Sequence, residues 1–147
     1  LTGKFIWRHR CSITVIGSIA GTINYAGYRL IRIDKRAYMA HRLAWFYIHG
    51  EWPEREIDHI NGERDDNRIA NLRVASRSQN TANQKRAIYN RTGFKGVGWS
   101  PRLQRFTSHI KIDGRRKYLG SYKTAEEAHQ SYCKAAADIF GEFARLA

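Results

Sequence analysis

Four polar residues in the middle of the chain have types and spacing suited to hydrolysis. Asp58 and His59 are adjacent, Asn71 follows twelve residues later, and Asn80 follows after nine more. An imidazole with an ordinary pKa of about 6.5 is largely neutral at pH 7 and can take a proton from water. Carboxylate and carboxamide oxygens are hard donors that Mg²⁺ or Mn²⁺ prefers. The set therefore predicts a general base beside one divalent cation.

The overall charge points to a polyanionic partner. The chain has 147 residues, a formal net charge of +13 and 42% hydrophobic residues. This length and composition fit a globular protein of one ordinary domain or two small ones. Each Lys or Arg placed against a phosphate releases a condensed counterion, so such a surplus is typical of nucleic-acid binding. On charge alone, a plain basic surface or a ribosome-associated RNA-binding protein remains an alternative.

The charge is divided unevenly along the chain. Seven of the thirteen acidic residues fall between Glu51 and Asp66, whereas residues 84–123 contain Asp113 alone against eleven Lys and Arg. The pattern separates a segment suited to holding a metal from one suited to holding phosphates.

Other features exclude several classes of protein. No long apolar run and no signal-peptide pattern are present, so we expect a cytoplasmic, DNA-associated protein without a membrane span. Cys11 and Cys133 are far apart in the sequence and are expected to be reduced, packed thiols. Because the first residue is Leu rather than Met, the sequence is compatible with a fragment of a longer chain.

The N-terminal region is predicted to form strands and then a helix. Aromatic and β-branched residues over 4–8 and 28–33 favour strands, and Ala37–Ala40 is expected to return after a turn at 34–36. Residues 41–49 are too apolar for a loop, and Gly50 is a good helix stop. We expect this helix to bury its Leu43, Phe46 and Tyr47 side, with His41 as a cap or packing residue that could also reach the site.

The polar set itself lies on a predicted strand, loop, strand and helix. Residues 56–60 and 72–75 read as the two strands, and Asn61-Gly62 is a turn signal. Ser76-Arg77-Ser78-Gln79 has the form of a capping box that starts a helix running to about Arg86. Adjacent strand residues face opposite sides, so Asp58 and His59 can share one site only where the strand bulges or ends.

The set Asp58-His59, Asn71 and Asn80, with Asn61-Gly62 and Asn71-Leu72-Arg73 between, resembles the HNH endonuclease motif. It is most similar to the phage homing-endonuclease branch, in which Asn replaces the third His, and His41-Arg42-Leu43-Ala44-Trp45 resembles the segment before the motif. The resemblance implies a ββα-metal fold that cleaves DNA with one divalent ion. It assigns His59 as general base, Asp58 and Asn80 as metal ligands, and Asn71 as the asparagine that holds the loop. With one formal negative charge among these ligands, we expect the ion to bind weakly until DNA phosphates complete its coordination.

The last third of the chain is predicted to be a separate small module. Residues 83–92 lose apolar periodicity and read as a basic linker segment, in which Lys85, Arg86 and Arg91 are expected to follow the DNA backbone. Three strand-like runs over 94–99, 105–112 and 117–122 form a meander. Thr124-Ala125-Glu126-Glu127 is a second capping box, and apolar residues from Ala125 to Ile139 recur at helical spacing, so one helix should cover one face of the sheet.

Residues 93–147 resemble an AP2 DNA-binding domain. The matching residues are Gly96-Val97, Arg105-Phe106, Ile110-Lys111, Tyr118-Leu119-Gly120, Tyr122, Thr124-Ala125-Glu126-Glu127-Ala128, Tyr132 and Ala135-Ala136. The resemblance implies a sheet laid in the major groove with its exposed face reading bases. The candidate contacts are Lys95, Trp99, Arg102, Arg105, Lys111 and Arg116, for each of which a phosphate contact or a solvated charge is the alternative.

Together these features predict an α+β protein with an HNH nuclease domain over 1–86, a linker over 87–92 and an AP2-like domain over 93–147. The expected function is metal-dependent cleavage of double-stranded DNA with Mg²⁺ or Mn²⁺, by a phage-encoded or homing enzyme that acts as a monomer or a DNA-induced dimer. The alternative is a non-catalytic DNA-binding regulator on a decayed nuclease scaffold.

Overall fold

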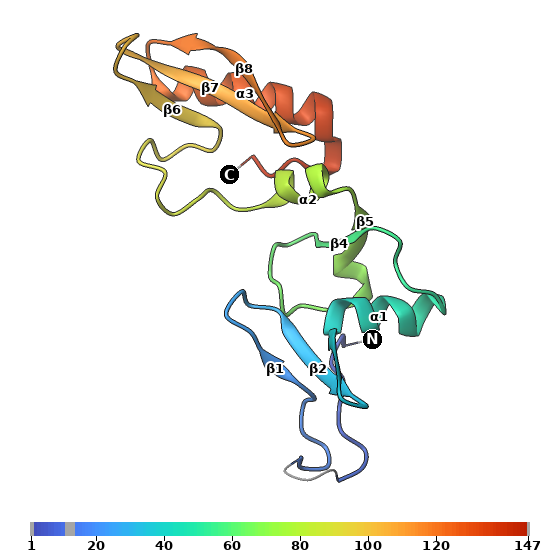
Figure 1. Ribbon diagram of the computed structural model, residues 1–147. Helices are drawn as coiled ribbons and strands as arrows, with labels where there is room; N and C mark the ends of the chain where they lie inside the picture. The colour runs from blue at the N-terminus through green and yellow to red at the C-terminus, as the bar shows by residue number, and fades with distance from the viewer. Residues whose placement is uncertain (1, 11–13, 147) are drawn as a thin grey trace. The chain divides into compact units, whose positions relative to one another are not determined.

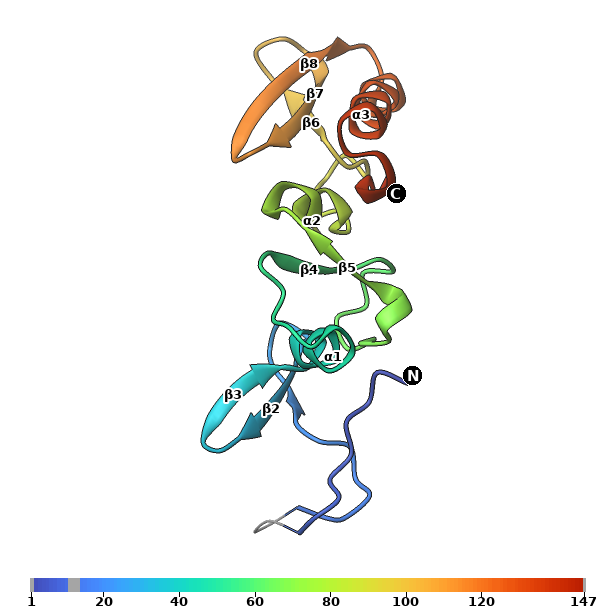
Figure 2. The ribbon, with the colours of Figure 1, turned by 90° about the vertical axis from the view of Figure 1, so that its right-hand side faces the viewer.

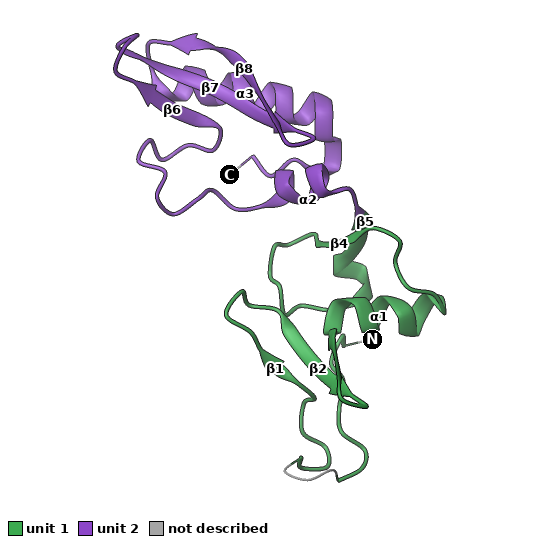
Figure 3. Ribbon diagram, in the orientation of Figure 1, with its two compact units in different colours: residues 1–74 green, residues 75–147 purple. Residues whose placement is uncertain are grey.

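The structure is a computed structural model that describes residues 2–10 and 14–146, so the prediction for Cys11 lies outside the described residues. The chain forms two compact units, residues 1–74 and 75–147 (Figure 3). Within the described residues, no helix is long and apolar enough to cross a membrane.

The first unit begins with an antiparallel sheet in the order β1 (Thr22–Ile23), β2 (Arg29–Ile33) and β3 (Arg36–Met39). Asp34 and Lys35 both take positive φ, 48° and 64°, which is the twist that a tight two-residue hairpin turn requires. The turn predicted at 34–36 is therefore confirmed. The strand predicted over 4–8 does not form as a regular element: the segment has an isolated bridge from Ile6 to Ile19 and backbone hydrogen bonds to residues 17–20. Gly17 and Gly21, each with φ of 84°, break the extended backbone on the partner side.

Helix α1 (Ala40–His49) follows β3 directly and ends where predicted, because Gly50 takes φ of 76° and its N–H bonds Phe46 O at 2.8 Å. The predicted buried side was wrong for Phe46 and Tyr47, which are exposed, whereas Leu43 packs against the cluster of Ala20, Ile31 and Ala40. Ala40, His41 and Ala44 are the buried residues, whereas Tyr47 is 74% exposed. The two small alanines let the helix approach Ile31 and Ile57 closely. The ring of Phe46 stacks instead on Trp52, with centroids 4.7 Å apart.

The central polar set lies on β4 (Glu56–His59), the 3₁₀ helix η1 (Ile69–Asn71), β5 (Leu72–Ala75) and α2 (Arg77–Asn83). Strands β4 and β5 pair, and Ile57 and Leu72 form a core with Ala44. The capping box is confirmed, since Ser76 Oγ accepts from Gln79 N–H and Gln79 Oε1 accepts from Ser76 N–H. The element order is the predicted one, while the ββα-metal arrangement in space stays a prediction.

The second unit contains the predicted meander. Strands β6 (Val97–Ser100), β7 (Arg105–Ile112) and β8 (Arg115–Tyr122) are antiparallel in that order. Asp113 and Gly114 both have positive φ and close the tight β7–β8 turn. Helix α3 (Ala125–Phe140), capped by Thr124 and Glu127 as predicted, lies along one face of this sheet in both views (Figures 1 and 2), and η2 (Gly141–Phe143) follows it.

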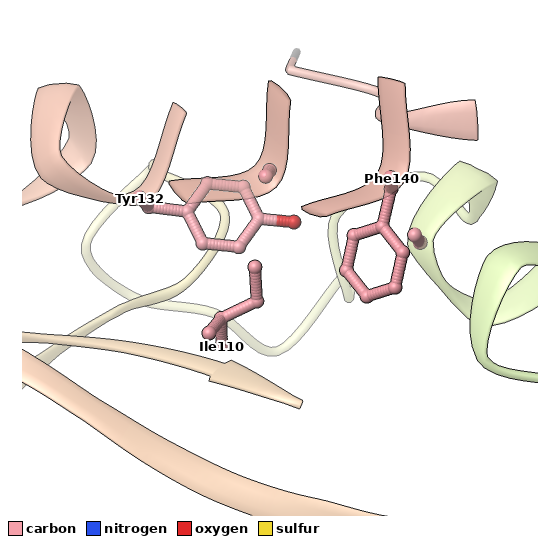
Figure 4. Close-up of a cluster of buried hydrophobic side chains, with 5 residues drawn as sticks. Ile110, Tyr132 and Phe140 are labelled. Atoms are coloured by element: carbon pink, nitrogen blue, oxygen red, sulfur yellow. The ribbon is translucent and has the colours of Figure 1, made fainter. Parts of the chain in front are cut away.

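The core of the second unit lies between α3 and β7. Ile110, Tyr132 and Phe140 meet there, and Ala136 has no exposed surface (Figure 4). Ala128 is likewise fully buried against Val97. Because these alanines are small, the helix approaches the strands closely, as their helical spacing predicted.

Helix α2 belongs to the second compact unit, which begins at Ala75. The division into a nuclease domain over 1–86, a linker and an AP2-like domain over 93–147 stays a prediction. Ala82 packs in the same core as Tyr132 and Phe140. In addition, the Lys95 ammonium donates to Ala82 O at 2.5 Å and Gln84 O at 2.8 Å. These contacts tie the end of α2 and the segment after it to the second unit.

The cap of α3 can be tested by substitution. Thr124→Ala removes the acceptor for Glu127 N–H, which lies at 3.2 Å, so we expect α3 to lose about 1 kcal/mol of stability, whereas Thr124→Ser should lose only a few tenths. Hydrogen exchange of the α3 amides measures both. Equal losses in the two variants would contradict a capping role for the hydroxyl.

Candidate active site

His59 is the last residue of β4, and only 4% of its surface is exposed. Its Nε2 lies 3.1 Å from Asn67 Oδ1. Asn67 Nδ2 in turn donates to Asp65 O at 3.2 Å, which fixes the orientation of the carboxamide. Because an amide oxygen only accepts, the neutral His59 ring carries its proton on Nε2. Nδ1 is then the basic nitrogen.

Two further rings surround His59 inside the first unit. The His41 ring meets it edge-on with centroids 5.2 Å apart, and the Tyr28 ring lies 6.0 Å away. Burial lowers the pKa of His59, against the opposing effects of the Asn67 hydrogen bond and the charges of Asp58 and Asp66. Burial, with the charges of His59 and Arg42, lowers the pKa of His41 to about 4. Both rings are therefore neutral at pH 7.

Asp58 has a different neighbour, as strand alternation requires. Its Oδ2 accepts from Arg73 Nε at 2.9 Å, and the side chains of Asp58 and Arg73 are 4% and 13% exposed. Arg73 stands on the paired strand β5. The carboxylate is thus buried and neutralised by a guanidinium from the neighbouring strand.

Asn71 holds the loop between β4 and β5. Its Oδ1 accepts from Asn61 N–H at 3.0 Å, and its Nδ2 donates to Asp66 O at 2.8 Å. Its backbone carbonyl also accepts from Ile60 N–H at 2.9 Å. One side chain therefore joins both ends of the loop that carries Asn67. Arg68 bonds the Asp66 carboxylate and lowers its pKa to about 2.

The N-terminal hairpin contacts the same loop. Arg29 makes a bidentate ion pair with Asp65, with N···O distances of 2.7 and 2.8 Å. Arg64 donates to Ala26 O at 2.7 Å and places its guanidinium 5.0 Å from the centre of the Tyr28 ring. Residues more than thirty positions before the loop thus hold it against the hairpin.

Asn80 lies on α2, in the second unit. Its role as a metal ligand together with Asp58 stays a prediction. Within the described residues, no group of three or more His, Cys, Asp or Glu could hold a metal. The predicted ligands Asp58 and Asn80 are one carboxylate and one carboxamide, so they would not be counted as such a group. Their hard oxygens suit Mg²⁺ or Mn²⁺. Asn83, at the end of the same helix, is buried.

The predicted DNA contacts fall on different parts of the second unit. Phe106 and Ile110 face α3, so Arg105, His109 and Lys111 project from the opposite face of β7. On β8, Arg116 and Tyr118 pair with Lys111 and His109 on this outward face. Arg116 Nη2 lies 3.1 Å from His109 Nδ1.

The other six predicted contacts lie elsewhere. Trp99 pairs with Phe106 and contacts its ring on the helix side, so it is not on the outward face. Lys95 donates to three backbone carbonyls, at Ala82, Gln84 and Arg145, and therefore has a structural role. Arg102 is exposed in the β6–β7 turn. Lys85, Arg86 and Arg91 are exposed in the segment after α2.

Four residues of this environment had no role in the predicted site: Tyr28, Asn67, Arg73 and, on the outward face of the sheet, His109. Asn67 and Arg73 stand within the motif, beside acidic residues and Asn71, which was a local signal for both. Tyr28 and His109 carry no motif spacing that would have marked them.

Residues 38–82 match the family model of the HNH endonuclease. The chain is also 28% identical over 112 residues to Protein 3.8 of Escherichia phage T7, in an alignment that covers 76% of this chain and 92% of that protein. No solved structure matches it. The matched segment runs from the end of β3 through α1, β4, η1 and β5 to most of α2. The AP2 resemblance and the homing type stay predictions.

The depressed pKa of His41 predicts a pH dependence of stability. The unfolded chain binds a proton at His41 near pH 6.5, whereas the folded chain does so only at about pH 4. The free energy of unfolding should therefore fall as pH decreases through this window, by roughly 2 kcal/mol between pH 7 and pH 5 from this residue. The substitution His41→Phe keeps an aromatic ring at this buried position and removes the contribution of His41 to the pH dependence.

Urea unfolding of the two proteins, followed by tryptophan fluorescence at both pH values, measures the difference. The same fall in the variant as in the parent would contradict the assignment to His41.

Proposed function

We propose that this protein is a metal-dependent HNH endonuclease that hydrolyses phosphodiester bonds in double-stranded DNA. The observation that carries the proposal is the His59–Asn67 hydrogen bond, which leaves Nδ1 as the basic nitrogen of a buried, neutral imidazole. A general base that is neutral at working pH is what deprotonation of an attacking water needs. The match of residues 38–82 to the HNH endonuclease family supports this chemistry.

In the proposed reaction, His59 Nδ1 takes the proton of the water that attacks phosphorus. Nε2–H stays bonded to Asn67 Oδ1 throughout, so the ring keeps its orientation while it gains charge. The negative charges of Asp58 and Asp66, which raise the pKa of His59, favour the imidazolium that results. Burial favours the neutral starting form and is the larger effect, so the pKa of His59 lies below its ordinary value.

Asp58 and Asn80 are the proposed ligands of one Mg²⁺ or Mn²⁺ ion, which when bound would stabilise charge on the phosphate and its leaving oxygen. Arg73 bonds Oδ2 of Asp58 and thereby orients the carboxylate. Asn71 holds the loop that presents Asn67. Each of these residues acts by positioning an oxygen or a ring.

The outward face of the β6–β8 sheet is the proposed DNA reader. Arg105, Lys111 and Arg116 present positive charge on that face, and a planar guanidinium can bond guanine or phosphate with two parallel hydrogen bonds. When the sheet face is bound to DNA, the tether raises the effective concentration of the nuclease site near that DNA. The nuclease thereby gains a preference for the sites that the sheet binds. The AP2 resemblance supports this role.

One active site with one His59 cleaves one DNA strand at a time, so a monomer would nick the duplex. Cleavage of both strands would need a DNA-induced dimer or a second binding event. A phage-encoded or homing enzyme is the proposed type. The relation to a phage T7 protein supports the phage origin.

The second candidate function is a non-catalytic DNA-binding regulator. The Arg73–Asp58 ion pair favours it, because a buried and neutralised carboxylate has a structural role without any metal.

Cleavage of supercoiled plasmid separates the two candidates. We expect nicked or linear product with Mg²⁺ or Mn²⁺ and none with EDTA. His59→Ala should lower the rate by at least about a hundredfold while leaving DNA affinity nearly unchanged, because it removes the base alone. His49→Ala, at an exposed histidine of α1, is the matched control. Intact DNA binding without cleavage in any metal would favour the regulator.

The sheet face is tested by adjacent arginines that project from opposite faces of β8. Arg116 pairs with Lys111 on the outward face, whereas Arg115 pairs with Ile112, which packs on the core beneath α3. We expect Arg116→Ala and Arg105→Ala to weaken duplex binding by roughly tenfold or more, and Arg115→Ala much less. Gel shifts at two salt concentrations measure this. Equal losses at Arg115 and Arg116 would contradict face-specific binding.

A further inference from the structure

The segment between α2 and β6 exposes two large apolar residues side by side. Ile88 and Tyr89 are 96% and 85% exposed. They occupy the two central positions of a turn that the Asn90 N–H closes on Ala87 O at 3.0 Å. Two adjacent apolar side chains that are almost wholly exposed to water forgo the free energy that burial would give. Such a pair marks a surface that a binding partner can cover.

The turn is anchored at both ends. Before it, Lys95 Nζ donates to Gln84 O at 2.8 Å. After it, Asn90 Nδ2 donates to Phe94 O at 2.8 Å, and Thr92 Oγ1 bonds Asn90 Oδ1 at 2.7 Å. Arg86 also reaches across the turn to Asn90 O at 2.9 Å. Ile88 and Tyr89 are therefore presented on an ordered turn, and little conformational entropy remains to be lost when a partner covers them.

The surroundings of the turn are positively charged. Lys85, Arg86 and Arg91 flank it within the sequence and are exposed. Asn90 also lines a hollow of about 510 Å³ together with His109, Lys111 and Arg116 of the outward sheet face. The apolar tip thus stands beside the proposed reading surface, and its nearest charges complement a polyanion.

We propose that Ile88 and Tyr89 form a wedge that inserts between base pairs of bound duplex DNA. The inference rests on the DNA binding in the proposed function and goes beyond it, because it assigns the turn the task of unstacking and bending the duplex. Apolar side chains on basic segments unstack a base step in this way, and the extra wrapped contacts offset the unstacking cost. The flanking cations hold the two backbones on either side of the opened step.

An aromatic and a branched aliphatic side chain suit the two parts of such a wedge. The Tyr89 ring can stack on one exposed base, and Ile88 fills the opened step. A protein partner would also cover the pair, but three cations next to it favour a polyanion.

Insertion unwinds DNA, and unwinding can be measured without knowing the target sequence. The full chain is bound to closed circular plasmid in EDTA, which prevents cleavage, and the plasmid is relaxed by a topoisomerase that needs no metal. The change in linking number is then compared among the parent, Ile88→Ala with Tyr89→Ala, and Tyr25→Ala. Tyr25 is 104% exposed in the first unit, so its variant removes an equally exposed tyrosine away from the turn. Protein concentrations are set to equal occupancy by gel shift.

We expect the parent and Tyr25→Ala to lower the linking number equally, and the double variant to do so at least about threefold less. An unchanged linking number at saturation with the parent, or equal unwinding by the double variant, would overturn the wedge. Either result leaves nuclease activity, measured separately with Mg²⁺, as it stands. Failure to shift any duplex would instead overturn the DNA binding on which the wedge rests.

Discussion

The hydrogen bond between His59 and Asn67 is the interaction on which the candidate site depends. A buried imidazole needs a partner for its N–H, since an unsatisfied polar group in the interior is costly. Asn67 is almost fully buried itself and stands in a loop with little apolar content. The loop must therefore be held by polar contacts, which the Asn71 carboxamide and the Arg29–Asp65 ion pair supply. Orientation of the base is thus a property of the whole loop and of the hairpin that holds it.

Polar contacts also explain how the first unit, which has few large residues in its core, stays ordered. Its buried apolar clusters are formed mainly by Ala20, Ile31, Ala40, Ala44, Ile57 and Leu72. Charged pairs take over where apolar packing ends, and Arg73–Asp58 is the most buried of them. A buried ion pair contributes little net stability but is expensive to break. Its value here is orientation, because it holds the Asp58 carboxylate on the strand that ends in His59.

In the second unit a single lysine joins segments that are distant in sequence. Lys95 donates to carbonyls of α2, of the segment after it and of Arg145 near the end of the chain. Burial, with the charge of Arg145, lowers its pKa to about 8, which still leaves the group mostly protonated at pH 7 and able to donate to these carbonyls. This arrangement places α2 with the meander, and it fixes the start of the exposed turn that carries Ile88 and Tyr89.

Local signals in the sequence were enough to predict much of this protein. Both capping boxes, the stop at Gly50 and the turn at 34–36 depend on residues within a few positions of one another, and the HNH motif depends on a spaced set within residues 58–80. Tertiary packing decided the rest. Asn67 and not another asparagine bonds His59, Arg73 lies fifteen residues from Asp58, and Arg29 lies thirty-six from Asp65. The burial of Ala40 and Ala44 rather than Phe46, and the helix-side position of Trp99, likewise follow from which surfaces meet. Sequence patterns record the conformational preferences of neighbouring residues, whereas the partner of a buried polar group is chosen only when distant segments pack together.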